Sequence, residues 1–168
     1  MINKFLLAVG VVLATATVTK KVLNMSTEKQ IYSGLIAAGM SSPLALCVLA
    51  QSKVETSVHG IPFMNRQFIM NNNPWGYSYV KGNSLQVVGG GGKHPEDAGV
   101  YAKYDSLDNA IKDIVGYYKR HIAHYSNVSD LQGYVAGIIS SKYQTGNPDN
   151  YLKGLKKYYK SENEILNV

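Results

Sequence analysis

One acidic residue stands at the polar end of an otherwise apolar stretch. In residues 50–57, AQSKVETS, the side chains of Gln51, Ser52 and Glu55 occupy positions i, i+1 and i+4 of a predicted helix. This helix would point the carboxylate of Glu55 at the place where the chain leaves the interior. A carboxyl group in that position can act as an acid in a chemical step, although most glutamates at helix ends are solvated surface residues.

The helix that carries Glu55 is predicted to be buried. Ser42 as N-cap and Pro43 as first helical residue begin it, and residues 44–50, LALCVLA, continue it with almost no polar face. Another helix is predicted before it, from Ser26 or Thr27 to Gly39. Three more are predicted after it, with starts at or near Ser106, Asp130 and Asp149.

A small β lobe is predicted between these two groups of helices. Residues 77–80 and 85–88 flank a turn and indicate a hairpin, and residues 99–104 indicate a third strand. The Gly-rich segment 89–97 lacks the strand-turn-helix context of a phosphate loop, so it is interpreted as a mobile lip. This order of elements is typical of an α+β enzyme with a cleft between two lobes, and Glu55 would face that cleft.

Composition sets wide limits on function. The chain has 168 residues, enough for one domain, and 17 Lys and Arg against 11 Asp and Glu give it a net charge of +6. Such a charge favours a polyanionic partner, whether nucleic acid, anionic lipid or acidic cell-wall polymer. The single cysteine, Cys47, excludes an intramolecular disulfide, and the 13 tyrosines provide rings suited to sugars and interfaces.

The N-terminus carries a membrane-targeting pattern. Residues 5–19 form an uncharged run between Lys4 and Lys20-Lys21, and residues 14–16, ATA, resemble a signal-peptidase site. The run is short against the roughly 20 residues that span a bilayer, but flanking lysines and residues 22–23 can extend it. We expect residues 1–25 to form an uncleaved membrane anchor. A cleaved signal peptide is the second interpretation, and a buried helix of the domain is the third.

Four blocks of the chain are distinctive in combination: residues 50–57 AQSKVETS, 73–76 NPWG, 101–106 YAKYDS and 142–151 KYQTGNPDNY. They resemble, in order and spacing, the AQ-x-x-x-E-S, N-L-F-G, F-R-x-Y-x-S and Y-A-T-D-P-x-Y-A segments of glycoside hydrolase family 73. This family comprises bacterial and phage endo-β-N-acetylglucosaminidase domains of the lysozyme-like superfamily. The resemblance extends over about residues 30–160.

The resemblance implies a lysozyme-like, mainly helical α+β domain over residues 26–168 that cleaves β-1,4 bonds of peptidoglycan. N-acetylglucosaminidase activity is the first expectation, with muramidase and lytic transglycosylase activity as the alternatives. It makes Glu55 the general acid and Tyr143 a second catalytic residue that orients the acetamido group or stabilises the transition state. The substrate-binding residues it implies are Gln51, Asn73, Trp75, Tyr77, Tyr79, Tyr104 and Tyr151. The acid must hold its proton near neutral pH, and partial burial and the negative end of the helix dipole both favour the protonated carboxyl.

The resemblance is incomplete in the β lobe. Many family members carry a second acid on the first strand of that lobe, but residues 77–88 contain no carboxylate. We favour a mechanism in which the N-acetyl group of the substrate takes the second role. The alternative is that Glu96 or Asp97 enters the cleft from the Gly-rich loop.

A different class of function is the alternative reading: a non-catalytic wall-binding or structural protein of a virion or membrane that keeps a lysozyme-like fold. No cofactor and no metal are expected, because His121 and His124 supply only two ligands, and no nucleic-acid-binding module is recognised. The expected partners are the glycan strand of peptidoglycan, a lipid membrane through residues 5–23, and other virion or envelope proteins. The expected location is a membrane, facing the bacterial cell wall or periplasm, or the membrane of a phage virion.

Overall fold

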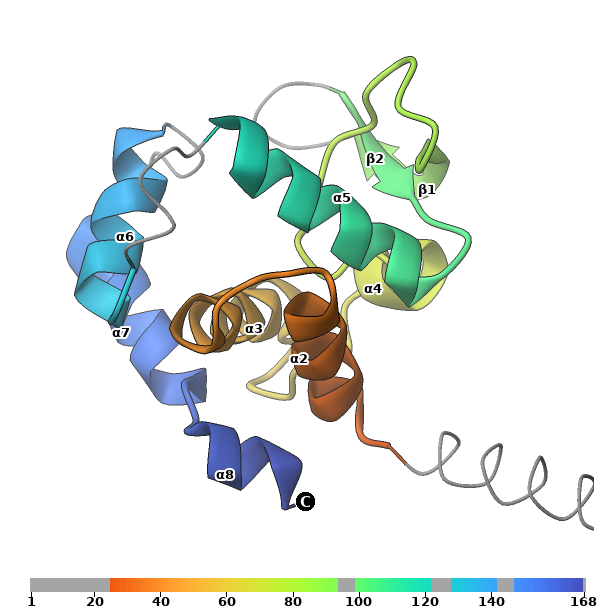
Figure 1. Cartoon of the computed structure of the whole chain (residues 1–168). Helices are drawn as coiled ribbons and strands as arrows, with labels where there is room; N and C mark the ends of the chain where they lie inside the picture. Colours follow the sequence, from red (N-terminus) through yellow and green to blue (C-terminus); the bar gives the residue numbers. More distant parts are fainter. Residues whose placement is uncertain (1–24, 94–98, 122–127, 142–146, 168) are drawn as a thin grey trace, which may run out of the picture.

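The structure, a computed structural model, describes residues 25–93, 99–121, 128–141 and 147–167. Within these ranges the chain forms a mainly helical α+β fold with a small antiparallel sheet, which confirms the predicted class. In chain order the elements are α2 (Thr27–Ala37), α3 (Ser42–Thr56), α4 (Arg66–Asn71), β1 (Val87–Lys93), β2 (Val100–Lys103), α5 (Leu107–His121), α6 (Leu131–Ser140), α7 (Pro148–Tyr158) and α8 (Glu162–Leu166). Figure 1 shows the longer helices gathered about α3, with the sheet and α4 to one side.

Helix α3 lies at the centre of the helical part because its sequence is apolar on every side. Every residue from Leu44 to Lys53 is buried, and the helix contacts α2, α6 and α7. Ser41 rather than Ser42 is the N-cap, so the helix begins one residue earlier than predicted. It ends at Thr56, which places Glu55 in the last turn.

The sheet pairs differently from the predicted hairpin. β1 and β2 are antiparallel, with Val88 opposite Ala102. The segment 77–80 does not pair with residues 85–88: the Tyr79 N–H donates to the carbonyl of Val100 (2.7 Å), and the Ala102 N–H donates to that of Tyr77 (2.8 Å). β2 therefore lies between the segment 77–79 and β1, because the third predicted strand supplies backbone groups to both neighbours.

The Gly-rich segment is also placed differently from the prediction. Residues 89–93 belong to β1 and so are not a mobile lip, while residues 94–97 lie outside the described ranges. A Cβ atom at Gly89 would lie only 2.5 Å from the backbone oxygen of Tyr101. The glycine therefore allows the two strands to approach closely at this point.

The other predicted helices are confirmed close to their predicted starts. Ser106 caps α5 by accepting a hydrogen bond from the Asn109 N–H (3.2 Å), and Asp130 caps α6. Helix α7 is capped by Asn147, two residues before the predicted start at Asp149. Two short helices were not predicted: α4 lies against both strands, and α8 contacts α2.

Several predictions fall outside the described residues. The predicted anchor over residues 1–25 does so except for Met25, and its lipid-contacting part, residues 5–23, does so completely. Glu96, Asp97, Tyr143 and His124 also lie outside. Among the helices that the structure describes, none has the length and apolar character needed to cross a membrane.

Candidate active site

Glu55 is held at the mouth of an open cleft by contacts from two other segments. It is half-buried in the last turn of α3, and its carboxylate oxygen Oε1 accepts a hydrogen bond from the Tyr151 hydroxyl of α7 (3.4 Å). Its backbone carbonyl accepts a shorter bond from Asn65 Nδ2 (2.7 Å), the residue that also caps α4. The acid therefore lies at the polar end of the apolar helix, as predicted, and the structure adds that α7 and the residue that caps α4 contact it there.

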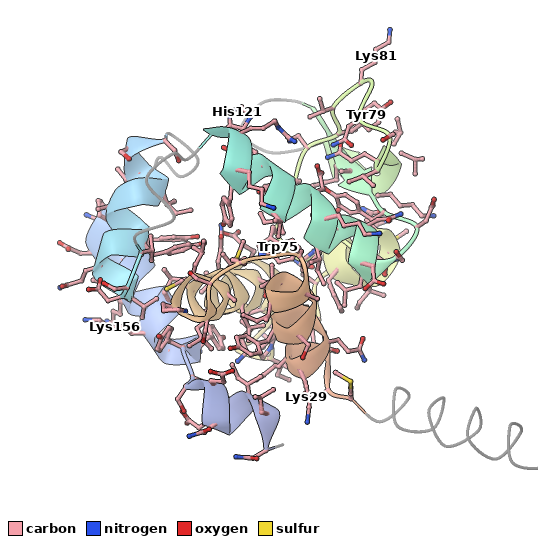
Figure 2. The ribbon with its side chains drawn as sticks, in the orientation of Figure 1. Lys29, Trp75, Tyr79, Lys81, His121 and Lys156 are labelled. Atoms are coloured by element: carbon pink, nitrogen blue, oxygen red, sulfur yellow. The ribbon has the colours of Figure 1, made fainter. Side chains whose placement is uncertain are left out.

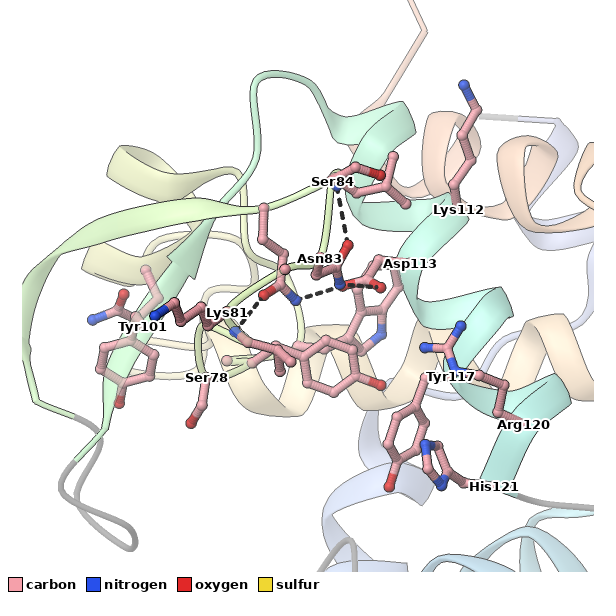
Figure 3. A pocket seen from close by; sticks show the side chains of 18 of the residues that line it. Ser78, Lys81, Asn83, Ser84, Tyr101, Lys112, Asp113, Tyr117, Arg120 and His121 are labelled. Atoms are coloured by element: carbon pink, nitrogen blue, oxygen red, sulfur yellow. Dashed lines mark hydrogen bonds between the residues drawn. The ribbon is translucent and has the colours of Figure 1, made fainter.

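The cleft has a volume of about 1030 Å³. The end of α3 forms one part of its wall through Glu55, the segment 75–86 forms another, and the exposed side of α5 forms a third. Figure 3 shows α5 on one side of this space and the segment that carries Ser78, Lys81 and Asn83 on the other. A cleft bounded by a helical part and a β part is a common site for an extended ligand.

A row of rings lies along the cleft. The ring centroids of Tyr77 and Tyr117 are 5.6 Å apart, and those of Tyr117 and His121 are 4.7 Å apart with the planes tilted by 36°. Burial raises the pKa of Tyr117, so its phenol is neutral at physiological pH. Sequence reasoning identified Tyr77 but missed Tyr117 and His121 as cleft residues, although their i, i+4 spacing on α5 places them on one helix face.

Asp113 is a second carboxylate in the wall of the same cleft, and sequence reasoning gave it no role in the site. It is 5% exposed on α5. Its Oδ1 accepts from Asn83 Nδ2 (2.9 Å), and its Oδ2 accepts from Gln86 Nε2 (2.6 Å) and the Tyr104 hydroxyl (2.8 Å). Burial, followed by the charge of Asp113, raises the pKa of Tyr104. Asp113 therefore fixes the segment 83–86 against α5, and a lone acid among the apolar positions of α5 was the available signal.

Three predicted substrate-binding residues are buried and are not among the residues that line the cleft. Gln51 is 0% exposed, and its Oε1 accepts from the hydroxyls of Tyr118 (2.8 Å) and Tyr134. Asn73 is also fully buried and joins the segment 73–77 to β2, since its Nδ2 donates to the carbonyls of Tyr77 (2.9 Å) and Ala102 (3.0 Å). Tyr104, as described above, belongs to the Asp113 network. These residues shape the walls and do not present atoms to the open space.

The remaining predicted residues are divided between the cleft and its surroundings. Tyr77 and Trp75 line the cleft, but Trp75 is only 3% exposed and donates its indole N–H to the carbonyl of Val48 (3.2 Å). Tyr79 is half-buried and is not among the lining residues. Tyr151 reaches the site through Glu55. Figure 2 shows Trp75 over α3, and Tyr79 and Lys81 at the β side of the molecule.

The charge of the cleft is mixed. The carboxylates of Glu55 and Asp113 share it with three exposed basic side chains, those of Lys81, Lys112 and Arg120. In the part of the chain that the structure describes, no group of three or more His, Cys, Asp or Glu side chains could hold a metal ion. The described cleft therefore offers proton transfer by a carboxyl group, ring contacts and attraction of anionic groups.

Comparison of the chain with family models, curated proteins and solved structures finds no match. A function for the cleft must therefore come from its own residues and from the order of the four sequence blocks. Of those blocks, residues 50–57 contribute Glu55, residues 73–76 contribute Trp75, and Tyr101 of the third block lines the cleft.

Proposed function

We propose that this protein is a lysozyme-like peptidoglycan hydrolase that cleaves β-1,4 glycosidic bonds of the glycan strand with Glu55 as general acid. The N-acetylglucosaminidase reaction is the first choice. The supporting observation is the position of Glu55: a half-buried carboxyl in the last turn of the central helix, bonded to Tyr151 and facing a cleft of about 1030 Å³. The sequence blocks that resemble glycoside hydrolase family 73 add support because they supply the same residue as the acid.

The chemistry requires an acid beside the leaving oxygen. Cleavage of a glycosidic bond develops an oxocarbenium-like centre on the sugar and leaves an alkoxide that must be protonated. Glu55 would supply this proton from Oε1 or Oε2, while the Tyr151 hydroxyl fixes the orientation of the carboxyl group through its contact at 3.4 Å. The rings of Tyr77 and Tyr117 would lie against sugar faces and so position the bond to be cleaved.

The second half of the reaction is assigned to the substrate. A retaining enzyme needs a nucleophilic carboxylate about 5 Å from the acid, an inverting enzyme needs a base at about 6.5–9.5 Å, and some families use the N-acetyl group of the sugar instead. Among the described residues, the other carboxylate that lines the cleft is Asp113, and both of its oxygens already accept hydrogen bonds. We therefore propose substrate assistance, in which Tyr143 orients the acetamido group or stabilises the transition state, with Glu96 or Asp97 as alternative bases.

The proposed location rests on the sequence of the N-terminal segment. We propose that residues 5–23 insert in a lipid membrane and present the cleft to the cell wall, from a bacterial membrane or from the membrane of a phage virion. Detection of a peptide that begins at Met1 in membrane fractions would support the uncleaved anchor. Recovery of the mature protein only with a start near residue 17 would contradict it.

The experiment that tests the enzyme proposal uses the purified full chain in detergent with isolated peptidoglycan. Release of new reducing ends is measured for the unmodified protein, for Glu55→Gln, and for Glu162→Gln, the same change at an exposed position of α8. We expect Glu55→Gln to lower the rate by about 10²- to 10⁴-fold, since that is the usual contribution of a general acid, and Glu162→Gln to leave it unchanged. Equal rates for all three proteins would exclude Glu55 as the acid.

Product analysis assigns the bond. Mass spectrometry of the released fragments distinguishes an N-acetylglucosamine reducing end from a muramic acid reducing end, which a muramidase produces. A 1,6-anhydro end instead identifies a lytic transglycosylase. Each result would assign a different bond or reaction to the same acid.

The occupied oxygens of Asp113 favour a second candidate function, a wall-binding protein without turnover. In that case peptidoglycan would sediment the protein but release no fragments, and Glu55→Gln would bind as well as the unmodified protein. Cleavage that depends on Glu55 would exclude this candidate.

A further inference from the structure

The side chain of Arg120 lies on the cleft side of α5, close to the helix backbone at Gly116. A Cβ atom at Gly116, one turn earlier, would lie 3.0 Å from Nη1 of Arg120. The guanidinium therefore lies over the backbone of α5, in space that any larger residue at position 116 would occupy. Figure 3 shows Arg120 with Tyr117 and His121 on the same side of the helix.

The guanidinium of Arg120 has no hydrogen-bonding or charged partner in the described part of the chain. Asp113, the nearest acid before it on α5, directs its oxygens to Asn83, Gln86 and Tyr104 instead. Arg120 thus presents N–H donors to the cleft, and a guanidinium binds a carboxylate with two parallel hydrogen bonds when one is offered.

The surroundings fit an acidic sugar. The rings of Tyr117 and His121, 4.7 Å apart, offer an apolar surface beside the guanidinium, and Lys81 and Lys112 add positive charge to the same cleft. Neutral sugars gain little from such charge, whereas a sugar that carries a carboxylate gains both ring contact and charge pairing.

We propose that Arg120 is a specificity residue that binds a carboxylate carried by the glycan, so that the cleft selects acid-substituted strands over neutral ones. The inference rests on the proposed function, because peptidoglycan carries free carboxylates on its stem peptides, and also on the lactyl ether of those muramic acid units that lack a peptide. Chitin oligosaccharides share the β-1,4 backbone of N-acetylated sugars and lack them. Lys112 and Lys81 supply general attraction, and Arg120 supplies the directed contact.

The test compares native peptidoglycan with the same material after carbodiimide-coupled amidation, which keeps glycan and peptide but removes the carboxylate charge. KM and kcat are measured for the full chain, for Arg120→Gln and for Lys119→Gln. Lys119 is exposed on the same turn of α5 but does not line the cleft, so its variant loses the same charge outside the site. Arg120→Gln should raise KM for native material about tenfold with kcat nearly unchanged, and should have no effect on amidated material.

Two results would overturn the proposal: an unchanged KM of Arg120→Gln on native peptidoglycan, or an equal rise with Lys119→Gln. Peptide-free strands, on which the lactyl carboxylate is free, identify the source of the charge: an Arg120 effect on them requires binding of the lactyl group, and an effect on peptide-bearing material alone assigns the contact to the peptide carboxylates. If neither the unmodified chain nor either variant cleaves native or amidated peptidoglycan, the proposed enzymatic function is wrong, but the proposed role of Arg120 can still be tested. Co-sedimentation with native and amidated peptidoglycan then still measures the contribution of Arg120, with the same expected difference between Arg120→Gln and Lys119→Gln.

Discussion

The substitution Glu28→Gln should weaken the helix that carries the candidate acid. Lys53 lies on α3, two residues before Glu55, and its side chain is 2% exposed. Its Nζ is 2.9 Å from Glu28 Oε1 and donates to the carbonyl of Tyr158 (3.2 Å), while Lys160 pairs with Glu28 Oε2 at 3.1 Å. Glu28 is thus the counter-ion of a buried ammonium group, and its replacement by an uncharged amide leaves that ammonium without the negative partner at 2.9 Å.

The expected loss of stability is about 3 kcal/mol. Removal of one partner from a buried ion pair costs about 3–5 kcal/mol, and we take the lower end because Glu28 is 22% exposed and Tyr158 remains as an acceptor. Lys160→Gln should cost less than about 1 kcal/mol, because the Lys160 side chain is 38% exposed and its pairing is screened by water. The double variant Glu28→Gln, Lys53→Met should recover most of the loss, because it removes the buried charge as well.

Urea unfolding followed by circular dichroism measures these differences. With a slope of roughly 2 kcal/mol per M, the Glu28→Gln midpoint should fall by about 1.5 M urea. An unchanged midpoint at pH 7 would refute the reasoning, and so would a double variant that is no more stable than Glu28→Gln alone.

The pH dependence gives a second check. Burial lowers the pKa of Lys53, and the hydrogen bond and charge of Glu28 act against that lowering. Without Glu28 the pKa of Lys53 falls further, so the cost of the buried charge is present at pH 7 and disappears as the pH rises toward the unfolded value of 10.5. Burial alone would raise the pKa of Glu28, but Lys53 and Lys160 lower it overall, so its stabilising contribution is present above pH 4.5 and is lost as the pH falls.

Three further predictions concern the core and the sheet. Gly89→Ala should destabilise the protein by about 2 kcal/mol or more, because its Cβ would lie 2.5 Å from a backbone oxygen of β2. Gly116→Ala should instead stabilise it by up to about 1 kcal/mol, because its Cβ meets only the end of one flexible side chain. Urea unfolding of both variants measures the two changes, and a loss of stability with Gly116→Ala as large as that with Gly89→Ala would contradict the reasoning. Burial, helped by a nearby negative charge, raises the pKa of the Cys47 thiol to about 12, so Cys47 should react with a disulfide reagent at pH 8 only after unfolding, and rapid reaction of the folded protein would contradict this burial. Burial and then the charge of Asp113 raise the pKa of Tyr104, so the contribution of its hydroxyl to stability is full below the unfolded pKa of 10.0 and declines above it. Tyr104→Phe should therefore cost about 1–3 kcal/mol of unfolding free energy at pH 8 and less at pH 10.5. Equal losses at both pH values would contradict the role given to the Asp113 network.

The sequence alone determined the helical framework and the position of the acid. Helix α3 was predictable because a run without a polar face has to be buried, and the caps Ser106 and Asp130 were predictable because capping depends on bonds within three residues. These are local properties of the chain. The position of Glu55 in the last turn of a buried helix follows directly from them.

Only the tertiary structure decided the pairing of the strands and the lining of the cleft. Residues 77–79 pair with β2 rather than with residues 85–88, and Gly89 permits a close approach that no local pattern describes. Gln51 has the residue type and spacing of a binding residue, yet it is fully buried and bonded to tyrosines of α5 and α6, while Asp113 and Arg120 reach the cleft. Whether a polar side chain contacts solvent or a buried partner depends on segments far away in the chain. The position of Glu55 was therefore predictable from sequence spacing, whereas the residues around it are determined by the tertiary structure.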